Sequence, residues 1–512
     1  MNKKRNIATM TIQVSVIMFI IKILGVLKQS IIAAICGATA ETDAYFIASG
    51  IIIALCSVVF SAVSISFLSM YTERLIQKGR KSANNLVNVV LRAFMPISIV
   101  IALLFLVFAP FWAKVFAPSY EGVQLKTLTH YIRIMAVMFV FSGYTLILNV
   151  VLEADKRFLP GKFQNLFQNA FIIIAAVFFY RDYGMNALLY AFIIAGMVQC
   201  IQITWCAREL FKIKFKVNIF DESHYIKKLI KLIIPLLMGN AIYEINDIVD
   251  KQIASSLGHG SVSFLSYGAS INEIVSTLII SSVSTVLFSH YATWIAEGAI
   301  KKIEDSIKKS LEILVVIIMP VMVMCFVCGD CIVAILYGRG SFGIQEIRFT
   351  TSVVWGYAIG FFFQAARANI IRVYYAFQDT KTPMINGIVA VCANICMSIG
   401  LSKIFGVGGI AMATSIAMLL VTILLLPGIK KYINDFNLKD SYMEYIKIII
   451  SGMLTGILSY FLRKFLNLKR IPTFLFIGIF VVAIYIVFIC LLRVRTVTEI
   501  SNVTMQKLKK DK

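Results

Sequence analysis

Charged side chains inside long apolar stretches are the residues of this sequence that could do chemistry. Lys22 and Lys28 stand in the first such stretch, and Arg367 and Arg372 stand in a later one. A cation at bilayer depth costs at least about 2.5–3.5 kcal/mol, so each must face water, an ionic partner or a ligand. Lys28 could extend its stem towards the end of its helix, but Lys22 is too central for that. We interpret these residues, Lys22 above all, as lining a cationic cavity.

Several carboxylates cluster in the apolar stretch 229–256. Glu244, Asp247 and Lys251 are spaced so that they share one helical face, which allows a carboxylate–lysine pair. Asp250 falls on a neighbouring face. Several acids in one membrane segment favour either coordination of a coupling cation or an internal salt-bridge cluster, and both interpretations stay open. Polar residues of three other segments join this candidate set, namely Glu273, Asn394 and Thr414.

Two polar turns between apolar stretches carry the remaining candidates. In GATAETD (37–43), Thr42 and Asp43 are expected to cap the helix that follows, and Asp43 could instead stand at the mouth of the cavity. The turn YYAFQDTKTP (374–383) contains Asp379, Lys381 and Pro383. Proline is tolerated in the first turn of a helix, so this turn predicts a tight hairpin. We expect its residues to fix the hairpin and a cytoplasmic gate.

The composition places these residues in a membrane. The chain has 512 residues, of which 59% are hydrophobic and only 15% charged, whereas soluble chains average about 25% charged. Its apolar runs are long enough to cross a hydrocarbon core of about 30 Å as helices. Because lipid cannot satisfy open backbone groups, we expect an all-α polytopic protein with about 14 transmembrane helices. The segments are 7–36, 44–71, 86–112, 129–152, 163–180, 185–207, 229–256, 262–290, 308–329, 350–376, 383–402, 407–427, 443–462 and 472–492.

The net charge of +23 is explained by the orientation of such a bundle rather than by nucleic acid. Cytoplasmic loops of membrane proteins are enriched in Lys and Arg. With the N-terminus in the cytoplasm, the predicted cytoplasmic loops hold most of the basic residues, in 74–81, 208–228, 301–309 and 493–512. Both termini are therefore predicted to be cytoplasmic. The basic loop 463–470 is the exception to this pattern.

Metal and catalytic motifs are not evident in the sequence. Cys325, Cys328 and Cys331 form a CxxCxxC pattern, but no further cysteine or histidine completes a ligand shell, so we interpret them as structural. No catalytic constellation stands out, so we expect no enzyme. No GxxxxGK[ST] loop is present either, so transport energy would come from ion gradients, membrane potential or a downhill product.

Recurring landmarks divide the chain into two halves. Gly37 precedes Gly258, Pro160 precedes Pro383, and Gly184 precedes Gly406, by 221 to 223 residues in each case. Each half has six predicted helices, an even number, so the halves form parallel repeats. We expect lobes at 1–208 and 229–428, a cytoplasmic amphipathic linker at 209–228, and an extra helix pair with a basic tail at 429–512. Substrate is expected between the lobes.

Four motifs in order resemble a known family. They are GVLKQSIIAAICGATAETDAYFIA (25–48), IVDKQIASSLGHGSVSFLSYG (248–268), LYGRGSF (336–342) and YYAFQDTKTP (374–383). Together they resemble the MurJ/MviN-type lipid II flippases of the multidrug/oligosaccharidyl-lipid/polysaccharide exporter superfamily. The resemblance implies that an alternating-access cavity moves an undecaprenyl-pyrophosphate-linked peptidoglycan precursor to the outer leaflet of the bacterial cytoplasmic membrane. Lys22 and Lys28 match family arginines that meet the pyrophosphate, and Asp43 matches a family aspartate.

The sequence also departs from the family pattern. Cys56 and Ser270 stand where the family carries arginines, and Arg367 or Arg372 could compensate. The resemblance further implies sodium binding at Asp250, Asn394 and Thr414, although a second acid of that site is Ser398 here. The expected coupling ion is sodium or a proton, with no other metal or cofactor.

The leading hypothesis is therefore a monomeric lipid II flippase acting in peptidoglycan synthesis, cell wall biogenesis and cell shape. Its partners would be the polyprenyl-linked glycan and membrane lipids, with no nucleic acid. Two alternatives stay open. The missing arginines would fit a flippase for another lipid-linked envelope polysaccharide. A cation-coupled drug antiporter of the same fold is less favoured, because Lys22 and Lys28 would repel cationic drugs.

Overall fold

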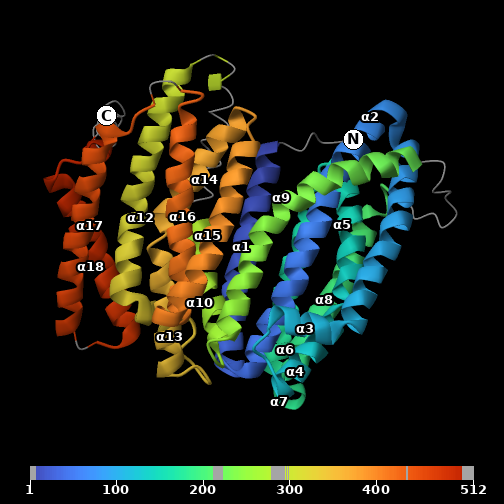
Figure 1. Cartoon of the computed structure of the whole chain (residues 1–512), viewed down its shortest axis with the longest axis horizontal. Coiled ribbons are helices and arrows are strands. Elements are labelled where there is room, and N and C mark those ends of the chain that lie inside the picture. Colours follow the sequence, from blue (N-terminus) through green and yellow to red (C-terminus); the bar gives the residue numbers. More distant parts are fainter. Residues whose placement is uncertain are drawn as a thin grey trace. The chain divides into compact units, whose positions relative to one another are not determined.

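The computed structural model describes residues 7–211, 223–277, 294–295, 297, 299–433, 436–466 and 468–498 (Figure 1). Within these ranges the regular structure is helical and contains no strand. The helices are α1 (Ile7–Cys36), α2 (Ala40–Val107), α3 (Ala109–Phe116), α4 (Gly122–Met135), α5 (Met138–Ala154), α6 (Leu159–Phe178), α7 (Tyr180–Tyr183), α8 (Met185–Ala207), α9 (Ser223–Ser255), α10 (Ser261–Val275), α12 (Ile300–Leu336), α13 (Ile344–Ala358), α14 (Phe361–Ala376), α15 (Lys381–Phe405), α16 (Val407–Ile429), α17 (Lys439–Phe465) and α18 (Arg470–Leu491).

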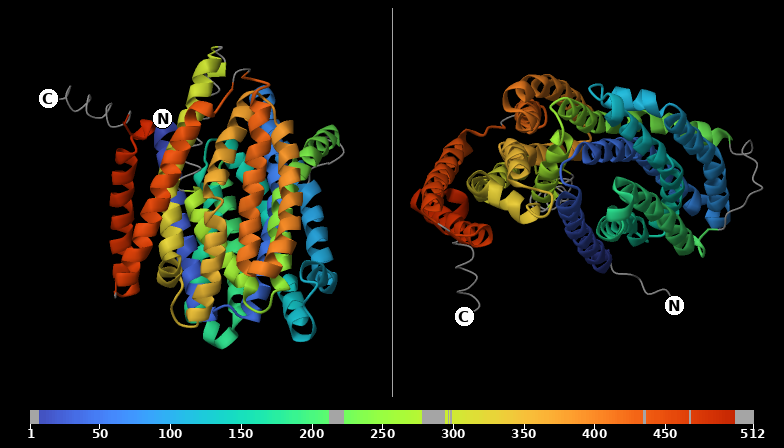
Figure 2. Two further views of the ribbon diagram at one scale, coloured as in Figure 1. Left: turned by 60° about the vertical axis from the view of Figure 1, so that its left-hand side comes forward. Right: turned by 90° about the horizontal axis from the view of Figure 1, so that it is seen from below.

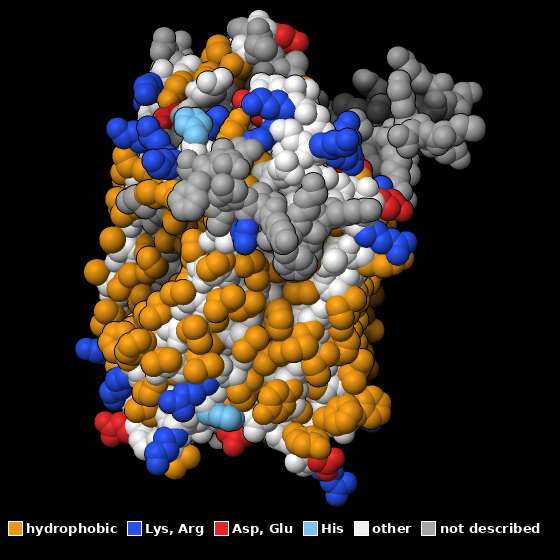
Figure 3. Space-filling model, turned by 90° about the vertical axis from the view of Figure 1, so that its right-hand side faces the viewer, with side chains coloured by type: hydrophobic (Ala, Val, Ile, Leu, Met, Phe, Trp, Pro, Cys, Tyr) orange, Lys and Arg blue, Asp and Glu red, His pale blue; other side chains and the backbone are white. Residues whose placement is uncertain are grey.

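These helices confirm the predicted class of fold. Each predicted membrane segment falls on one or two of them, except that residues 278–290 of one segment lie outside the described residues. In the part of the chain that is described, nine helices are long and apolar enough to cross a membrane. Figure 3 shows one face on which hydrophobic side chains form a broad band, with charged side chains gathered at its two ends. The chain is a multi-pass membrane protein.

Two predicted loops behave differently from the expectation. The basic loop 74–81 is helical, so α2 contains two predicted segments and passes through a single non-helical residue, Gly79, at φ 75°. The predicted segment 129–152 is divided between α4 and α5 at Ala136 and Val137. A glycine is needed at the first of these bends, because positive φ strains other residues.

The chain forms two compact units. Unit 1 comprises residues 1–263 and 339–342, and unit 2 comprises residues 264–338 and 343–512. Helix α9 belongs to unit 1, where it packs against α2. Most of the predicted linker, at 212–222, and most of the predicted basic tail, at 499–512, lie outside the described residues, and the predicted lobe boundaries stay a prediction.

The backbone confirms the internal repeat. Helix α8 begins at Met185 and ends at Ala207, and α16 begins and ends 222 residues later, at Val407 and Ile429. The glycines before them, Gly184 and Gly406, have φ of 56° and 59°. Aligned helices and aligned turn conformations at one constant offset show that the halves share a backbone plan.

The hairpin turns of the two halves share a less common feature. Lys156 and Gln378 both have φ of 62°, although neither is glycine. In each turn a backbone N–H closes back on the helix, from Arg157 to Leu152 at 2.8 Å and from Asp379 to Tyr374 at 2.9 Å. This left-handed ending satisfies carbonyls at the helix C-terminus. The weak similarity of EADKRFLP and YYAFQDTKTP therefore reflects one conserved turn.

The extra helices belong to unit 2. Helices α17 and α18 lie side by side, and both pack on α12 (Figures 1 and 2). On α12, Glu312 is almost fully buried, and its carboxylate accepts hydrogen bonds from Ser441 at 2.5 Å, Arg495 at 2.9 Å and Thr496 at 2.6 Å. A buried carboxylate is tolerated only with such partners. It ties the segment after α18 to the bundle.

Candidate functional site

A polar cavity lies inside unit 1. Its volume is about 280 Å³, and helices α2, α5, α6 and α8 form its walls. None of its lining residues is charged. Its polar side chains are hydroxyls and amides, namely Ser57, Ser61, Ser64, Ser142, Thr145, Asn149, Gln164, Asn165, Gln168 and Gln199.

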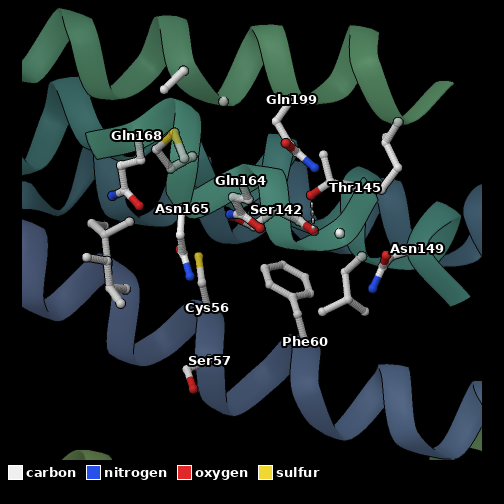
Figure 4. Close-up of a pocket in the computed structure, with 18 of the residues that line it drawn as sticks. Cys56, Ser57, Phe60, Ser142, Thr145, Asn149, Gln164, Asn165, Gln168 and Gln199 are labelled. Carbon is white, nitrogen blue, oxygen red and sulfur yellow. Dashed lines mark hydrogen bonds between the residues drawn. The ribbon is translucent and has the colours of Figure 1, made fainter. Parts of the chain in front are cut away.

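Figure 4 shows how these side chains meet. Asn165 on α6 points towards Cys56 on α2, and Gln199 approaches from α8. The Nδ2 atom of Asn149 donates to Glu153 at 2.9 Å, and the Nε2 atom of Gln199 donates to the carbonyl of Pro160 at 3.3 Å. The Oδ1 atom of Asn149 and the Oε1 atom of Gln199 are buried without a hydrogen-bond partner. The cavity therefore offers polar capacity that the protein does not use.

A second, larger cavity lies within unit 2 and is apolar. Its volume is about 970 Å³, and α12, α14, α16 and α17 line it. Phe326, Phe363 and Phe461 are among its walls, and Gly452 and Gly456 of α17 open it. The hydroxyl of Thr422 already donates within the protein, to Met418 at 2.7 Å. The groove suits a hydrocarbon chain. The sequence had suggested that the C-terminal helix pair serves packing only, whereas α17 forms one wall of this groove.

The predicted cavity lysines lie on α1. Lys22 and Lys28 are half-buried, and both have interaction partners within the protein. Helix α1 packs on α6, where Asn169 donates to the carbonyl of Ile21 at 3.3 Å and lies against Gly25. Their predicted contact with an anionic ligand stays a prediction.

Asp43 takes a role that differs from the predicted cap. Thr39 is the residue that caps α2, and it accepts from the N–H of Thr42 at 3.3 Å. The carboxylate of Asp43 is 1% exposed and accepts from the N–H of Gly260 at 2.6 Å, the N–H of Ser263 at 2.7 Å and the hydroxyl of Ser263 at 2.6 Å. The prediction that Asp43 caps its own helix is wrong, because it caps the start of the next repeat. A contact with substrate stays a prediction.

The acids of α9 divide into two pairs. Lys251 and Asp247 form the predicted ion pair, with 2.6 Å between Nζ and Oδ2, and the lysine lies against Gly50 of α2. Asn246 donates to buried Asp250 at 3.2 Å. Glu244 lies beside Ser57 of α2. The salt-bridge interpretation is confirmed for Asp247 and Lys251, while ion coupling stays a prediction.

Unit 2 brings other predicted residues together. Asn394 and Thr414 are joined by a 3.0 Å hydrogen bond, and Ser398 donates to the Oδ1 atom of Asn394 at 3.3 Å. Asp250 belongs to unit 1, so a sodium site that includes all three predicted ligands stays a prediction. Among the described residues no group of three or more His, Cys, Asp or Glu side chains could hold a metal ion.

The remaining predicted cations and acid of unit 2 are placed along its helices. Arg367 and Arg372 lie half-buried on α14, and Glu273 lies on α10. All three have interaction partners within the protein. Arg367 stands 222 residues after Thr145, which lines the polar cavity of unit 1. The two halves therefore carry different charges at corresponding positions.

The turn at 374–383 is held by Asp379. Its carboxylate accepts from the N–H of Thr382 at 3.0 Å, the hydroxyl of Thr382 at 2.7 Å and the hydroxyl of Tyr432 at 2.8 Å. Partial burial would raise the pKa of this carboxyl, but these hydrogen bonds and the charge of Lys431 lower it to about 2. Lys381 is exposed, and Pro383 lies in the first turn of α15 as predicted. The role of Asp379 in fixing the turn is confirmed, and the gate stays a prediction.

Sequence reasoning missed the residues of the polar cavity. Gln164, Asn165 and Gln168 have helical spacing that places them on one face of α6, and that signal was available. Asn149 and Gln199 come from other helices, so the sequence could not show that they join the same cavity. The amides of α6 were the one readable sign of it.

Comparison with known proteins separates the possible families. The family model described as "Lipid II flippase MurJ" matches residues 32–486. The chain belongs to the MurJ family. A family relative in Thermotoga maritima, named "Probable lipid II flippase MurJ", is 24% identical over 501 residues, which covers 94% of this chain and 96% of the relative.

Solved structures agree on the fold of this MurJ family member. The structure titled "Lipid II flippase MurJ, inward closed conformation" matches with a TM-score of 0.81 at 24% identity, covering 93% of this chain and 98% of that chain. An inward-facing multidrug resistance MATE family transporter of the MOP superfamily matches with a TM-score of 0.67 at 12% identity, covering 82% of this chain and 96% of that one. At these identities both likenesses concern the fold alone.

Proposed function

We propose that this MurJ family member carries lipid II from the inner to the outer leaflet of the bacterial cytoplasmic membrane by alternating access. It would act in peptidoglycan synthesis as a monomer, with both termini in the cytoplasm. The action moves a molecule without making or breaking covalent bonds in it. We further propose that sodium or a proton supplies the coupling.

The observation that carries the proposal is the apolar groove of unit 2. A polyprenyl chain has no polar group, so it requires a continuous apolar surface. The groove offers about 970 Å³ lined almost wholly by hydrophobic side chains. Helix α14 contributes Ala366 and Ile370 to this lining and carries Arg367 and Arg372. An apolar groove and guanidinium groups on one helix suit an amphipathic ligand with an anionic head, since guanidinium binds phosphate well.

A second candidate is a flippase for another lipid-linked envelope polysaccharide. Cys56 stands where the family carries an arginine, and it lines a cavity without charged residues. A loss of positive charge at a ligand-facing position would change which headgroup is accepted. The drug-antiporter alternative has less support, because half-buried Lys22 and Lys28 disfavour organic cations.

The direct test is complementation in a bacterium whose own lipid II flippase is depleted. Lipid II in the outer leaflet is then measured after the gene for this chain is induced. We expect lipid II exposure and growth to be restored. Growth without lipid II exposure, or no rescue by a protein that is present in the membrane, would refute the proposal. Restored export of another polysaccharide intermediate would instead establish the second candidate.

A matched pair of variants tests the groove. A Cβ atom at Gly456 would meet only methyl groups of Val323, at 3.9 Å, so Gly456→Trp can fill the groove without a backbone clash. A Cβ atom at Gly400 of α15 meets nothing within 4 Å, so Gly400→Trp is the control. We expect the first variant to abolish rescue and the second to retain it. Equal rescue by both would show that the groove does not hold the substrate.

A further inference from the structure

The polar cavity of unit 1 has a chemistry that the proposed function does not yet use. We propose that it is a binding site for an uncharged group rich in hydroxyls and amides, specifically one ring of an N-acetylated sugar. The inference rests on the proposed function in one respect: such a ring would belong to the headgroup of the lipid-linked precursor. Its chemistry can be tested separately from transport.

The absence of charge in the lining selects for a neutral ligand. No Asp, Glu, Lys, Arg or His lines the cavity, although charged residues lie nearby on the same helices. An ionised ligand would lose its hydration there without gaining a counter-charge, which is costly. Cys56 leaves the α2 wall neutral at the position where the family carries an arginine. The cavity should therefore reject phosphates, carboxylates and ammonium groups.

The polar side chains select for hydroxyl and amide groups. Serine, threonine, asparagine and glutamine each offer a donor and an acceptor, which matches ligand groups that also have both. The amide nitrogens of Asn149 and Gln199 are engaged with Glu153 and Pro160, while their oxygens have no partner. Unpaired buried acceptors cost stability, and a donor from a ligand would remove that cost after a small rotation of the amide.

The size and the walls fit one ring rather than a whole headgroup. A volume of about 280 Å³ lies just below the usual range of small-molecule sites, roughly 300–1,000 Å³. Phe60 supplies an aromatic surface beside Ser142 and Thr145, against which the C–H groups of a sugar ring can pack (Figure 4). A Cβ atom at Gly161 would collide with the amide of Asn149, and one at Gly196 would meet the sulfur of Met138 at 2.9 Å. These glycines keep the cavity open.

Cys56 provides a reporter inside the cavity. The full-length protein in lipid nanodiscs is treated with N-ethylmaleimide, and modification of the peptide that contains Cys56 is measured by mass spectrometry. The probes are N-acetylglucosamine, glucosamine at pH 6, where it is cationic, and glucuronate, which is anionic. We expect N-acetylglucosamine to slow alkylation about threefold at about twice its Kd, because only unoccupied protein reacts. The two charged sugars should give no protection.

Two variants show whether protection comes from the cavity. Gln164→Leu/Gln168→Leu removes two amides for which the described residues show no structural hydrogen bond. Gln202→Leu is the control, because Gln202 lies on α8 three residues after Gln199, outside the cavity lining. Protection should be lost in the double variant and retained in the control. The wild-type measurement decides the question even if the double variant fails to fold.

Each outcome separates the cavity from the transport proposal. Equal alkylation with and without N-acetylglucosamine, or equal protection by all three sugars, overturns the inference and leaves lipid II transport untouched. Selective protection with no lipid II translocation by the wild-type protein supports the sugar site and overturns the proposed function. Selective protection that is also lost on Gln164→Leu/Gln168→Leu, together with weaker lipid II transport by that variant, supports both.

Discussion

Replacing Asp43 with alanine tests the unexpected cap between the two repeats. The variant removes the acceptor for two backbone N–H groups and one hydroxyl, all of them buried, at Gly260 and Ser263. A hydrogen bond to a charged group contributes about 1.5–3 kcal/mol. The three bonds are not additive, because the Ser263 hydroxyl can turn to another acceptor, so we expect Asp43→Ala to cost about 3–5 kcal/mol.

The assay is thermal unfolding of the purified protein in detergent, followed by tryptophan fluorescence. A loss of that size should lower the apparent midpoint by roughly 6–15 °C for a unit of this length. Glu41→Ala is the matched control, because Glu41 lies two residues earlier in the same helix turn and is exposed. Its midpoint should stay within roughly 2 °C of the wild type, as usual for surface substitutions.

The two roles considered for Asp43 predict different results. If the carboxylate is a cap, stability falls and the remaining folded protein still transports. An Asp43→Ala protein that melts with the wild type would refute the capping argument. If such a protein had also lost lipid II transport, Asp43 would be assigned to substrate binding instead.

Three further predictions follow from the contacts described. Asp379→Ala should destabilise the protein at pH 7. Because the folded pKa of Asp379 is lowered to about 2 from an ordinary value of 3.8, that difference from the wild type should shrink as pH falls from about 4 towards 2 in urea titrations. A double-mutant cycle on Asp247 and Lys251 should give a coupling of about 0.3–1 kcal/mol in the same assay, since Asp247 is 54% exposed; zero coupling would make the pair incidental. Lys22→Ala should abolish complementation, whereas Lys22→Arg should retain it; full activity of the alanine variant contradicts a cavity role.

The sequence was sufficient for the architecture because the architecture depends on local signals. Apolar length marked the helices, and the landmark pairs Gly184–Gly406 and Pro160–Pro383 marked the repeat. The Asp247–Lys251 pair was predictable for the same reason, since helix geometry fixes which residues four positions apart meet.

Contacts between distant segments could not be read in this way. Asp43 meets Gly260 across 217 residues, and no local spacing announces such a partner. The cap that local sequence does suggest, at Thr42 and Asp43, is provided by Thr39 instead. Likewise, Asn149 and Gln199 are unremarkable polar residues in separate helices until the fold places both beside α6. Side-chain function here depends on packing that composition and periodicity do not encode.

The different residues at one repeated position have an evolutionary consequence. Thr145 and Arg367 stand on the same backbone plan, one beside a neutral cavity and the other on a cationic helix. A duplicated scaffold lets each half acquire mutations without altering the other. Selection for a new glycan could therefore act on α5 and α6 while α14 keeps its affinity for phosphate. Swapping threonine and arginine between the halves would show how far the two copies have become specialised.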